Sequence, residues 1–424
     1  MTKKIPLLFL FILSFQFNTA QEVFKTMFYN VLNYPLEQGS ISRLQDLDVI
    51  LNDFQPDLFM ICELNNEQGA NDILNILINM NSSFSRATFV PNTSDNTIGD
   101  QNDLQNMLYY DSSKFILQSQ HEVTTLYRDF NHYVLKLNTL NQNLNPIILN
   151  VFICHLKASD GYDNEQLRLS MVNDFVSYLN NNLADNSYII LGGDLNIYRN
   201  SEPAFEELLN TTNDNDITFV DPANRVGSWH NNPNYLDVFT QSTRTQTGLG
   251  GATGGFDDRF DFILTSENML TNPDIFYVSN SYQVYGNNNN PNCWNSEINS
   301  DDCSGSVFSA AIRESLYYMS DHLPVTAKFQ TNETTLHNTD IVLEDDMISF
   351  LNGNIVSSTL QLKVNNNTNN ISELHIFNSL GQKIANISID NTDIITIDTF
   401  FLSSGLYYIT TNTFSIKPLK FIKK

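Results

Sequence analysis

The fold of this chain is decided by a short stretch in its middle, Leu191-Gly192-Gly193-Asp194-Leu195-Asn196. The apolar run Ile189–Gly192 before it predicts a buried strand, and the stretch ends in a carboxylate and an amide. A single acidic residue at the end of a strand usually forms a turn or caps a helix. Five other strand-like runs end in the same way, so the pattern as a whole indicates a site built from strand ends.

The five other polar patches lie far apart along the chain. They are Asn30 in Phe28-Tyr29-Asn30-Val31, Glu63 in Ile61-Cys62-Glu63-Leu64, His155 in Ile153-Cys154-His155-Leu156-Lys157, Asp261 in Arg259-Phe260-Asp261-Phe262-Ile263, and the pair Asp321 and His322 in Ser320-Asp321-His322-Leu323-Pro324. Each patch alone has an ordinary structural explanation. Together they supply carboxylates for a metal ion and imidazoles for proton transfer.

Around these patches, apolar strand patterns alternate with helical ones, which favours an α/β architecture. The expected strands are Thr26–Leu32, Leu58–Cys62, Asn106–Tyr110, Ile147–Cys154, Ile189–Gly192 and Phe260–Leu264, and the expected helices are Glu165–Asn181 and Glu202–Leu209. After a linker at Thr331–Asn338, short strands with turns predict a small β-sandwich: Met347–Leu351, Leu360–Val364, Glu373–Phe377, Lys383–Ile389, Ile394–Thr399 and Gly405–Thr411.

With these patches in this order, residues Phe24–Phe329 resemble the endonuclease/exonuclease/phosphatase superfamily, which has the DNase I-like fold. The resemblance implies a four-layer sandwich in which two mixed sheets pack face to face with helices outside. It places the active site at one rim, where strand ends converge. The expected domains are a signal peptide at 1–20, the enzyme domain at 21–330, a linker at 331–339 and a tail domain at 340–424.

The resemblance also implies a role for each residue. Glu63 is the main Mg²⁺ ligand, and Asn30 and Asp321 lie near the same ion; Mn²⁺ is an alternative, and Ca²⁺ an additional structural ion. His322 is the catalytic histidine, oriented by Asp261. Asp194 holds or deprotonates the attacking water, Asn196 donates to the phosphoryl oxygen, and His155 donates a proton or contacts phosphate.

Two basic residues are candidate phosphate contacts, with a solvated surface position as the alternative for each. Arg128 lies where DNase I-like enzymes carry a phosphate-binding arginine, and Lys157 follows His155 by two residues. DNase I-like nucleases also pair a second glutamate with the first histidine. This sequence has no clear counterpart, and Asp103 is the nearest candidate.

Three other segments permit more than one interpretation. Trp229 and His230 lie in a loop that could stack a base or sugar, although aromatic loop residues often pack locally. Arg259 is expected to form a structural salt bridge. The run Gly248–Gly255 is too irregular for a dinucleotide or phosphate-loop motif and is interpreted as a mobile loop.

The tail resembles the C-terminal sorting domain of proteins exported by the Bacteroidetes type IX secretion system. The matching stretches are Leu374–Lys383, Leu402–Tyr408 and Lys420–Lys424. The resemblance implies the type IX machinery as a partner and a secreted or surface-attached protein. The alternative is a carbohydrate-binding or adhesive β-module.

The N-terminus agrees with export. Lys3 and Lys4, the apolar run Ile5–Phe15 and the small residue Ala20 form the pattern of a secretory signal, and no later stretch is long and apolar enough to cross a membrane. Export permits disulfides. Cys293 and Cys303 could close a short loop, whereas Cys62 and Cys154 lie in apolar runs and are expected to be buried thiols.

The chain is strongly acidic, with 22 basic and 47 acidic residues and a formal net charge of −25. Lys3 and Lys4 contribute +2 and residues 338–424 contribute −2, so residues 21–337 carry −25. This charge argues against a protein that binds nucleic acid or anionic lipid through a broad basic face. A metal-dependent enzyme is not excluded, because bound divalent cations supply positive charge locally.

The sequence therefore predicts a secreted, metal-dependent phosphoesterase, with extracellular nucleic acid as the leading substrate. A phosphatase or phosphodiesterase for small or lipid phosphates, of the inositol phosphate or sphingomyelin type, is the alternative within enzymes. A binding or adhesion protein that kept the fold and lost the chemistry is the alternative outside them; the complete set of polar positions speaks against it.

Overall fold

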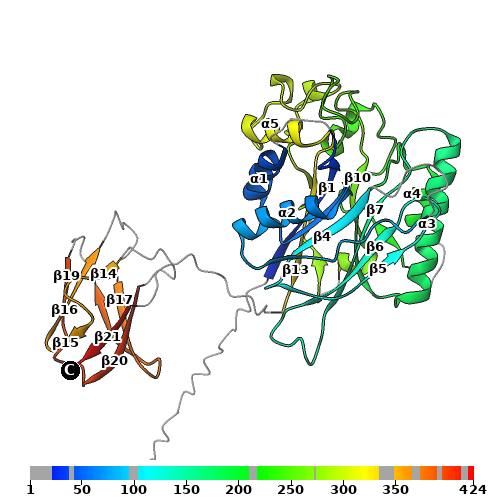
Figure 1. The fold of residues 1–424 in the computed structure, drawn as a ribbon. Coiled ribbons are helices and arrows are strands. Elements are labelled where there is room, and N and C mark those ends of the chain that lie inside the picture. The colour runs from blue at the N-terminus through cyan, green and yellow to red at the C-terminus, as the bar shows by residue number, and fades with distance from the viewer. Residues whose placement is uncertain are drawn as a thin grey trace, which may run out of the picture. The chain divides into compact units, whose positions relative to one another are not determined.

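The centre of the N-terminal unit is a pair of mixed β-sheets, seen in the computed structural model shown in Figure 1. The structure describes residues 22–37, 43–94, 104–209, 217–271, 274–333, 348–364, 373–388, 394–411 and 419–424. The predicted signal peptide and Asp103 lie outside these ranges. The chain divides into two compact units at His337 and Asn338.

The first sheet has seven strands and is built around a parallel pair, β1 (Glu22–Tyr34) and β2 (Leu58–Leu64). Antiparallel neighbours flank this pair on both sides, β13 (Val325–Thr331) next to β1 and β4 (Gln105–Asp111) next to β2. The short strands β3 (Phe84–Arg86), β11 (Phe276–Tyr277) and β12 (Gln283–Val284) complete it.

The second sheet has six strands in the order β5-β6-β7-β8-β10-β9. Its parallel pair is β7 (Ile148–His155) with β8 (Tyr188–Asp194), and all other neighbours are antiparallel. The remaining strands are β5 (Phe115–Val123), β6 (Phe130–Leu137), β9 (Phe219–Val220) and β10 (Asp261–Ser266).

The two sheets pack face to face, with β1 and β2 against β8 and with helices outside each sheet (Figure 1). The helices on the first sheet are α1 (Arg43–Phe54), α2 (Glu67–Met80) and α5 (Ala310–Met319), and those on the second are α3 (Tyr162–Asn182) and α4 (Pro203–Leu208). Short 3₁₀ turns occur at Pro233–Val238, Glu267–Leu270, Pro291–Cys293 and Asp301–Cys303. The predicted fold class, a four-layer α/β sandwich, is confirmed.

Burial on both faces explains why the central strands were visible in the sequence. β2 begins Leu58-Phe59-Met60-Ile61-Cys62, an uninterrupted apolar run whose side chains are all inaccessible to solvent. The six predicted strands correspond to β1, β2, β4, β7, β8 and β10, and the two predicted helices to α3 and α4. The sequence interpretation missed the longer strands β5, β6 and β13, the short strands β3, β9, β11 and β12, and the helices α1, α2 and α5.

The C-terminal unit is a two-sheet β-sandwich, as predicted. One sheet pairs β14 (Ile348–Phe350), β16 (Thr359–Val364) and β19 (Ile394–Asp398). The other has the order β15-β21-β20-β17-β18, formed by β15 (Ile355–Val356), β21 (Leu419–Lys423), β20 (Gly405–Thr411), β17 (Glu373–Asn378) and β18 (Lys383–Ser388). Alternating residues such as Leu374 and Ile376 on β17 form its core.

The cysteines behave as the sequence indicated. Cys293 and Cys303 form a disulfide, whereas Cys62 and Cys154 are buried free thiols. No helix among the described residues is long and apolar enough to cross a membrane.

Candidate active site

The polar patches of the sequence meet at one rim of the two sheets. On the second sheet, His155, Asp194 and Asp261 lie directly side by side in register on β7, β8 and β10. On the first sheet, Asn30 follows the centre of β1 and Glu63 lies near the end of β2. Asp321 and His322 precede β13, which runs antiparallel to β1 and so brings them to the same rim.

Asn30 connects the two sheets at this rim. Its Nδ2 donates to Glu63 Oε1 at 2.8 Å and to Asp194 Oδ2 at 3.0 Å, and it lies 3.4 Å from His322 Nε2. Its Oδ1 accepts from the backbone N–H of Leu32 at 2.9 Å. In this orientation the amide offers hydrogen-bond donors to the carboxylates. The role predicted for Asn30, an oxygen ligand near the metal, would require the amide to turn.

His322 has the surroundings of a catalytic histidine. Its Nδ1 lies 2.7 Å from Asp261 Oδ2, so the neutral ring donates Nδ1–H to this carboxylate and keeps a lone pair on Nε2. Nε2 is 3.8 Å from Asp194 Oδ2. Burial lowers the pKa of His322, but Asp261, Asp321 and Asp194 outweigh burial and raise it well above the ordinary value.

Asp194 is almost completely buried between the sheets. Burial raises the pKa of Asp194 above its ordinary value; His322 opposes this, and the Asp261 and Glu63 carboxylates add to it. Burial also raises the pKa of Glu63, with a further contribution from Asp321. So many carboxylates at short range repel one another, and a cation in their midst would relieve that repulsion.

The hydrogen bonds of the Asp321 and Asp261 carboxylates also indicate that this cluster can bind a hard divalent cation. Asp321 Oδ2 accepts two hydrogen bonds, from Gln241 Nε2 at 2.9 Å and from the backbone N–H of Ala252 at 2.7 Å. Asp321 Oδ1 is buried and has no hydrogen-bond partner among the described residues, and the same holds for Asp261 Oδ1. A buried carboxylate oxygen without a donor is an available ligand for Mg²⁺ or Mn²⁺.

His155 lies beside the same carboxylates, with Nε2 3.6 Å from Asp194 Oδ2 and 3.8 Å from Glu63 Oε1. Burial, reinforced by Arg128 and His322, lowers its pKa well below the ordinary value. His155 Nδ1 is buried without a hydrogen-bond partner in the described part of the chain. Asp103, the nearest candidate for its partner in the sequence, lies outside that part.

The loop after β7 carries Lys157 and is contacted by Arg128 and Asn196. Arg128 Nη1 and Asn196 Nδ2 both donate to the backbone oxygen of Leu156, at 3.0 and 3.3 Å. Arg128 is buried, and burial lowers its pKa although Glu63 and Asp194 oppose this. Lys157 is half-buried. Its Nζ lies 5.6 Å from the centroid of the Tyr127 ring, and the Arg128 guanidinium carbon lies 5.1 Å from the same centroid. Two basic groups therefore lie next to the acidic cluster.

Local backbone geometry aims the site residues. Glu63 has a φ of 60° and Asn196 a φ of 51°, values that non-glycine residues adopt at some cost in free energy. The pairing of β1 with β2 shifts register beyond Asn30, which is typical of a bulge that redirects side chains. At Gly193 a Cβ atom would lie 2.5 Å from Cys154 Sγ, so the residue before Asp194 must be glycine for β7 and β8 to pair this closely.

A buried ion pair holds the two loops that carry Lys157 and Asn196. Arg168 Nη2 lies 2.7 Å from Glu202 Oε2, and neither side chain is accessible to solvent. Arg168 Nη1 donates to the backbone oxygens of Lys157 and Ser159, while Glu202 Oε1 accepts from the backbone N–H of Tyr198. The pair therefore connects α3 and α4 to both loops.

Sequence reasoning missed Gln241, whose Nε2 lies 2.6 Å from His322 Nε2 as well as next to Asp321. Thr240-Gln241-Ser242 has no strand or motif pattern that would have singled it out. The run Gly248–Gly255 also has more contacts than a mobile loop would be expected to make. Arg244 Nη1 donates to the backbone oxygens of Leu249 and Gly250, and the backbone N–H of Ala252 donates to Asp321 Oδ2.

Trp229, His230 and Arg259 lie in the segments for which the sequence permitted more than one interpretation. Trp229 cannot stack a base, because it is fully buried and packs on Phe205 and Phe262. His230, next to it, is half exposed and pairs with Asp258 at 2.7 Å. Arg259 forms the expected structural salt bridge, with both of its terminal nitrogens 2.8 Å from Asp221.

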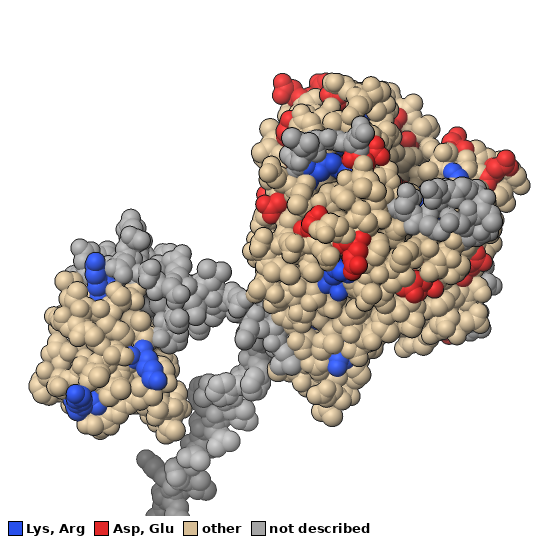
Figure 2. All heavy atoms as spheres, in the orientation of Figure 1, with Lys and Arg blue, Asp and Glu red and all other residues tan. Residues whose placement is uncertain are grey.

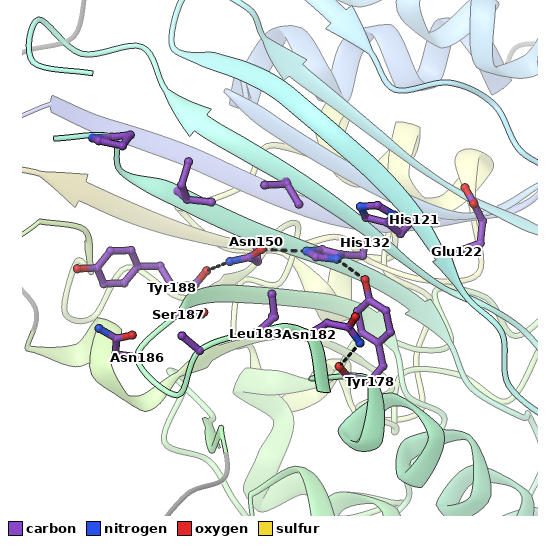
Figure 3. Close-up of a pocket in the computed structure, with 14 residues that line it drawn as sticks. His121, Glu122, His132, Asn150, Tyr178, Asn182, Leu183, Asn186, Ser187 and Tyr188 are labelled. Atoms are coloured by element: carbon purple, nitrogen blue, oxygen red, sulfur yellow. Dashed lines mark hydrogen bonds between the residues drawn. The ribbon is translucent and has the colours of Figure 1, made fainter. Parts of the chain in front are cut away.

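A separate cavity of about 730 Å³ lies between the outer face of the second sheet and α3 (Figure 3). His132 is its central polar group, with Nε2 2.9 Å from Asn150 Oδ1 and Nδ1 3.0 Å from the Tyr178 hydroxyl. Within the described residues, both groups of side chains that could hold a metal belong to the rim cluster: Glu63, His155 and Asp194, and Asp194, Asp261 and His322. The rim, not this cavity, is therefore the candidate active site.

Comparison with solved structures gave several similar folds. D. rerio TDP2 complexed with a single-strand DNA product is 14% identical with a TM-score of 0.45, over 73% of this chain and 99% of that chain. The human Nocturnin catalytic domain with bound sulfate is 14% identical, TM-score 0.44, over 73% and 97%. ANGEL2, a 2′,3′-cyclic phosphatase, is 13% identical, TM-score 0.41, over 74% and 96%. These values are too low to assign an activity.

Sequence comparison identified the family of the tail. Residues 354–424 match the family described as the secretion system C-terminal sorting domain, so the resemblance of the tail is confirmed. No curated protein matched the sequence.

Proposed function

We propose that the N-terminal unit is a metal-dependent phosphoesterase that hydrolyses phosphodiester bonds with an activated water. The observation that carries this proposal is the buried arrangement of His322 between Asp261 at 2.7 Å and Asp194 at 3.8 Å, beside Glu63 and Asp321. Asp321 Oδ1 has no hydrogen-bond partner among the residues that the structure describes. An imidazole oriented by one carboxylate and facing another is arranged for proton transfer.

The side chains divide the chemistry between them. Glu63 and Asp321 would hold Mg²⁺ or Mn²⁺, which when bound neutralises charge on the phosphoryl oxygens. Asp194 orients the attacking water and accepts its proton, while Asp261 fixes the His322 ring through Nδ1 so that the ring, when protonated, can give a proton to the leaving oxygen. Asn196, Arg128 and Lys157 offer donors for the phosphate, and neutral His155 is placed to contact it through Nε2.

A nuclease acting on extracellular DNA or RNA is the leading activity. The surface favours a second candidate, a phosphodiesterase or phosphatase for small or lipid phosphates, because acidic side chains are scattered over the visible face of this unit with few basic ones between them (Figure 2). Residues 21–337 carry a formal charge of −25, which repels a long polyanion.

One assay tests the proposal and separates the two substrates. The purified chain is incubated with plasmid DNA, RNA, bis-nitrophenyl phosphate and inositol phosphates, each with Mg²⁺, Mn²⁺ or a chelator. We expect metal-dependent turnover of bis-nitrophenyl phosphate and of one natural class. Absence of turnover with every substrate and both cations would contradict the proposal and favour a binding protein.

We propose further that the protein is secreted or attached to the cell surface. The support is the sorting domain at 354–424, whose machinery is the implied partner, together with the predicted signal peptide at 1–20. Expression of the chain with and without residues 340–424 in a host with type IX secretion tests this: the full chain should reach the medium or surface, and the truncated chain should accumulate inside.

A further inference from the structure

Gln241 joins the two functional halves of the rim. Its Nε2 donates to Asp321 Oδ2 at 2.9 Å and lies 2.6 Å from His322 Nε2. A carboxylate can only accept hydrogen bonds, so the amide nitrogen must face Asp321. When the His322 ring is neutral and gives its Nδ1–H to Asp261, its Nε2 carries a lone pair that accepts from the same amide.

The backbone holds this amide in place from both sides. Gln241 pairs with Asp258 on one side and with His322 on the other. Its N–H donates to Asp258 O at 3.0 Å and its carbonyl oxygen accepts from the N–H groups of Asp257 and Asp258. The neighbouring Thr240 carbonyl accepts from Leu323 N at 2.7 Å. A side chain on such a fixed backbone has few ways to leave its partners.

The consequence for Asp321 is that its two oxygens become different. Gln241 and the Ala252 N–H together occupy Oδ2, at 2.9 and 2.7 Å. Oδ1 is left buried without a hydrogen-bond partner in the described chain, 4.0 Å from His322 Nε2. The carboxylate is thus prevented from rotating, and one oxygen stays directed at the cluster.

We propose that Gln241 is a positioning residue of this site: it fixes Asp321 so that Oδ1 is presented to the divalent cation, and it holds the His322 ring in the plane that Asp261 sets. The inference rests on the proposed function for its catalytic half, while the metal half stands on the geometry of Asp321. Gln241 acts through its two partners and not by contact with substrate. Groups that orient a ligand are worth roughly ten- to a hundredfold in metal affinity or activity.

The experiment compares the full chain with Gln241→Met, which keeps the length of the side chain and removes its donors, and with Gln241→Glu, which keeps the shape and adds repulsion from Asp321. Gln330→Met is the matched control, because Gln330 is a half-buried glutamine near the end of β13, where it pairs with Val23 on β1 and Phe276 on β11. Two quantities are measured for each: the dissociation constant for Mn²⁺ by calorimetry without substrate, and kcat and KM for bis-nitrophenyl phosphate. Circular dichroism melting checks that each variant is folded.

We expect both Gln241 variants to bind Mn²⁺ at least about tenfold more weakly and to lose at least about tenfold in kcat, with KM within about twofold of the wild-type value once Mn²⁺ is saturating. Values within twofold of the Gln330→Met control would overturn the proposal. So would a rise in KM with kcat unchanged, since that would mean direct substrate contact. If the wild-type chain turns over no substrate, the proposed function fails, and the Mn²⁺ constants still decide the role of Gln241.

Discussion

At the residue scale, the central feature of the rim is the His322 imidazole, which lies among three carboxylates but has only two ring nitrogens to bond with them. His322 Nδ1 binds Asp261, while Nε2 faces Asp194 and the amide nitrogens of Asn30 and Gln241. The carboxylates favour the protonated ring, whereas the amide donors favour a lone pair on Nε2. A residue with such balanced surroundings is suited to take up and release a proton during one turnover.

The first prediction concerns Asp261→Asn. This change keeps the size of the side chain but removes the charge and permits the wrong tautomer of His322, so we expect kcat to fall by roughly two to four orders of magnitude. Steady-state kinetics on bis-nitrophenyl phosphate with saturating Mg²⁺ measures the change. Asp237→Asn, at a surface ion pair, is the control. A kcat within tenfold of wild type would show that Asp261 does not orient the catalytic ring.

Whether the sequence predicts a site residue depends on whether that residue lies on an apolar strand or in an irregular segment. Glu63, His155, Asp194 and Asp261 follow or begin apolar strands, and burial of those strands leaves a pattern in the chain. Gln241 lies in an irregular segment and owes its place to backbone pairing with residues far along the chain. Such pairing leaves no local signal, so this part of the site is visible only in three dimensions.

At the element scale, α3 and α4 act as supports for the loops of the rim. The Arg168–Glu202 pair is fully buried, so removing one partner leaves an uncompensated charge in the interior. We predict that Glu202→Ala lowers the free energy of unfolding by about 3–5 kcal/mol. Urea denaturation measures it, with the exposed neighbour Glu206→Ala as control. Replacing both partners, by Arg168→Met and Glu202→Leu, should cost less; an equal or greater loss would contradict this account.

His132, on strand β6 of the sheet next to α3, makes the free energy of unfolding depend on pH. Burial lowers the pKa of His132 from 6.5 to about 4, and the Asn150 bond only partly offsets this. Above pH 6.5 the ring is neutral in both states; as the pH falls from 6.5 towards 4, the unfolded chain takes up a proton that the folded chain does not, so stability is lost on acidification. The contribution of His132 should therefore weaken by about 2 kcal/mol between pH 7 and pH 5.

The comparison that isolates this effect is wild type against His132→Gln, because other groups titrate in the same range. Urea midpoints of both proteins are measured at pH 7 and pH 5. The difference between the two proteins should change by the stated amount in favour of the variant at pH 5. His121→Gln, at the exposed histidine opposite on β5, should leave the pH dependence nearly unchanged. An identical pH dependence for wild type and His132→Gln would rule out His132 as the source.

Elements were predictable to the extent that their burial was uniform. The apolar runs of β2, β7 and β8 are buried on both faces and were recognised. β5 was missed because only its end residues, Phe115 and Val123, are buried, while the positions between them are half-buried or exposed and include a register shift between Leu117 and Ser119. The helix α1 was missed because only a narrow stripe, including Leu47, Ile50 and Leu51, faces the core.

At the scale of the whole molecule, the charge of the chain predicts how it meets a long substrate. Residues 21–337 carry −25, and the two basic side chains beside the cluster, Arg128 and Lys157, are buried and half-buried. A protein that binds nucleic acid through a basic face loses affinity as salt rises. Here the dominant long-range term is repulsion, which salt screens over a Debye length of about 8 Å at 0.15 M.

We therefore expect the KM for duplex DNA to fall at least about threefold as NaCl is raised from low concentration to about 0.15 M, at constant Mg²⁺. The KM for bis-nitrophenyl phosphate should stay nearly constant, because a small diester carries a single charge and meets only the local field of the metal and the rim. The ratio of the two constants is the quantity to measure, since it cancels any effect of salt on the catalytic groups. A KM for DNA that instead rises with salt would mean that local basic contacts dominate over the net charge, and would favour a substrate path along Arg128 and Lys157.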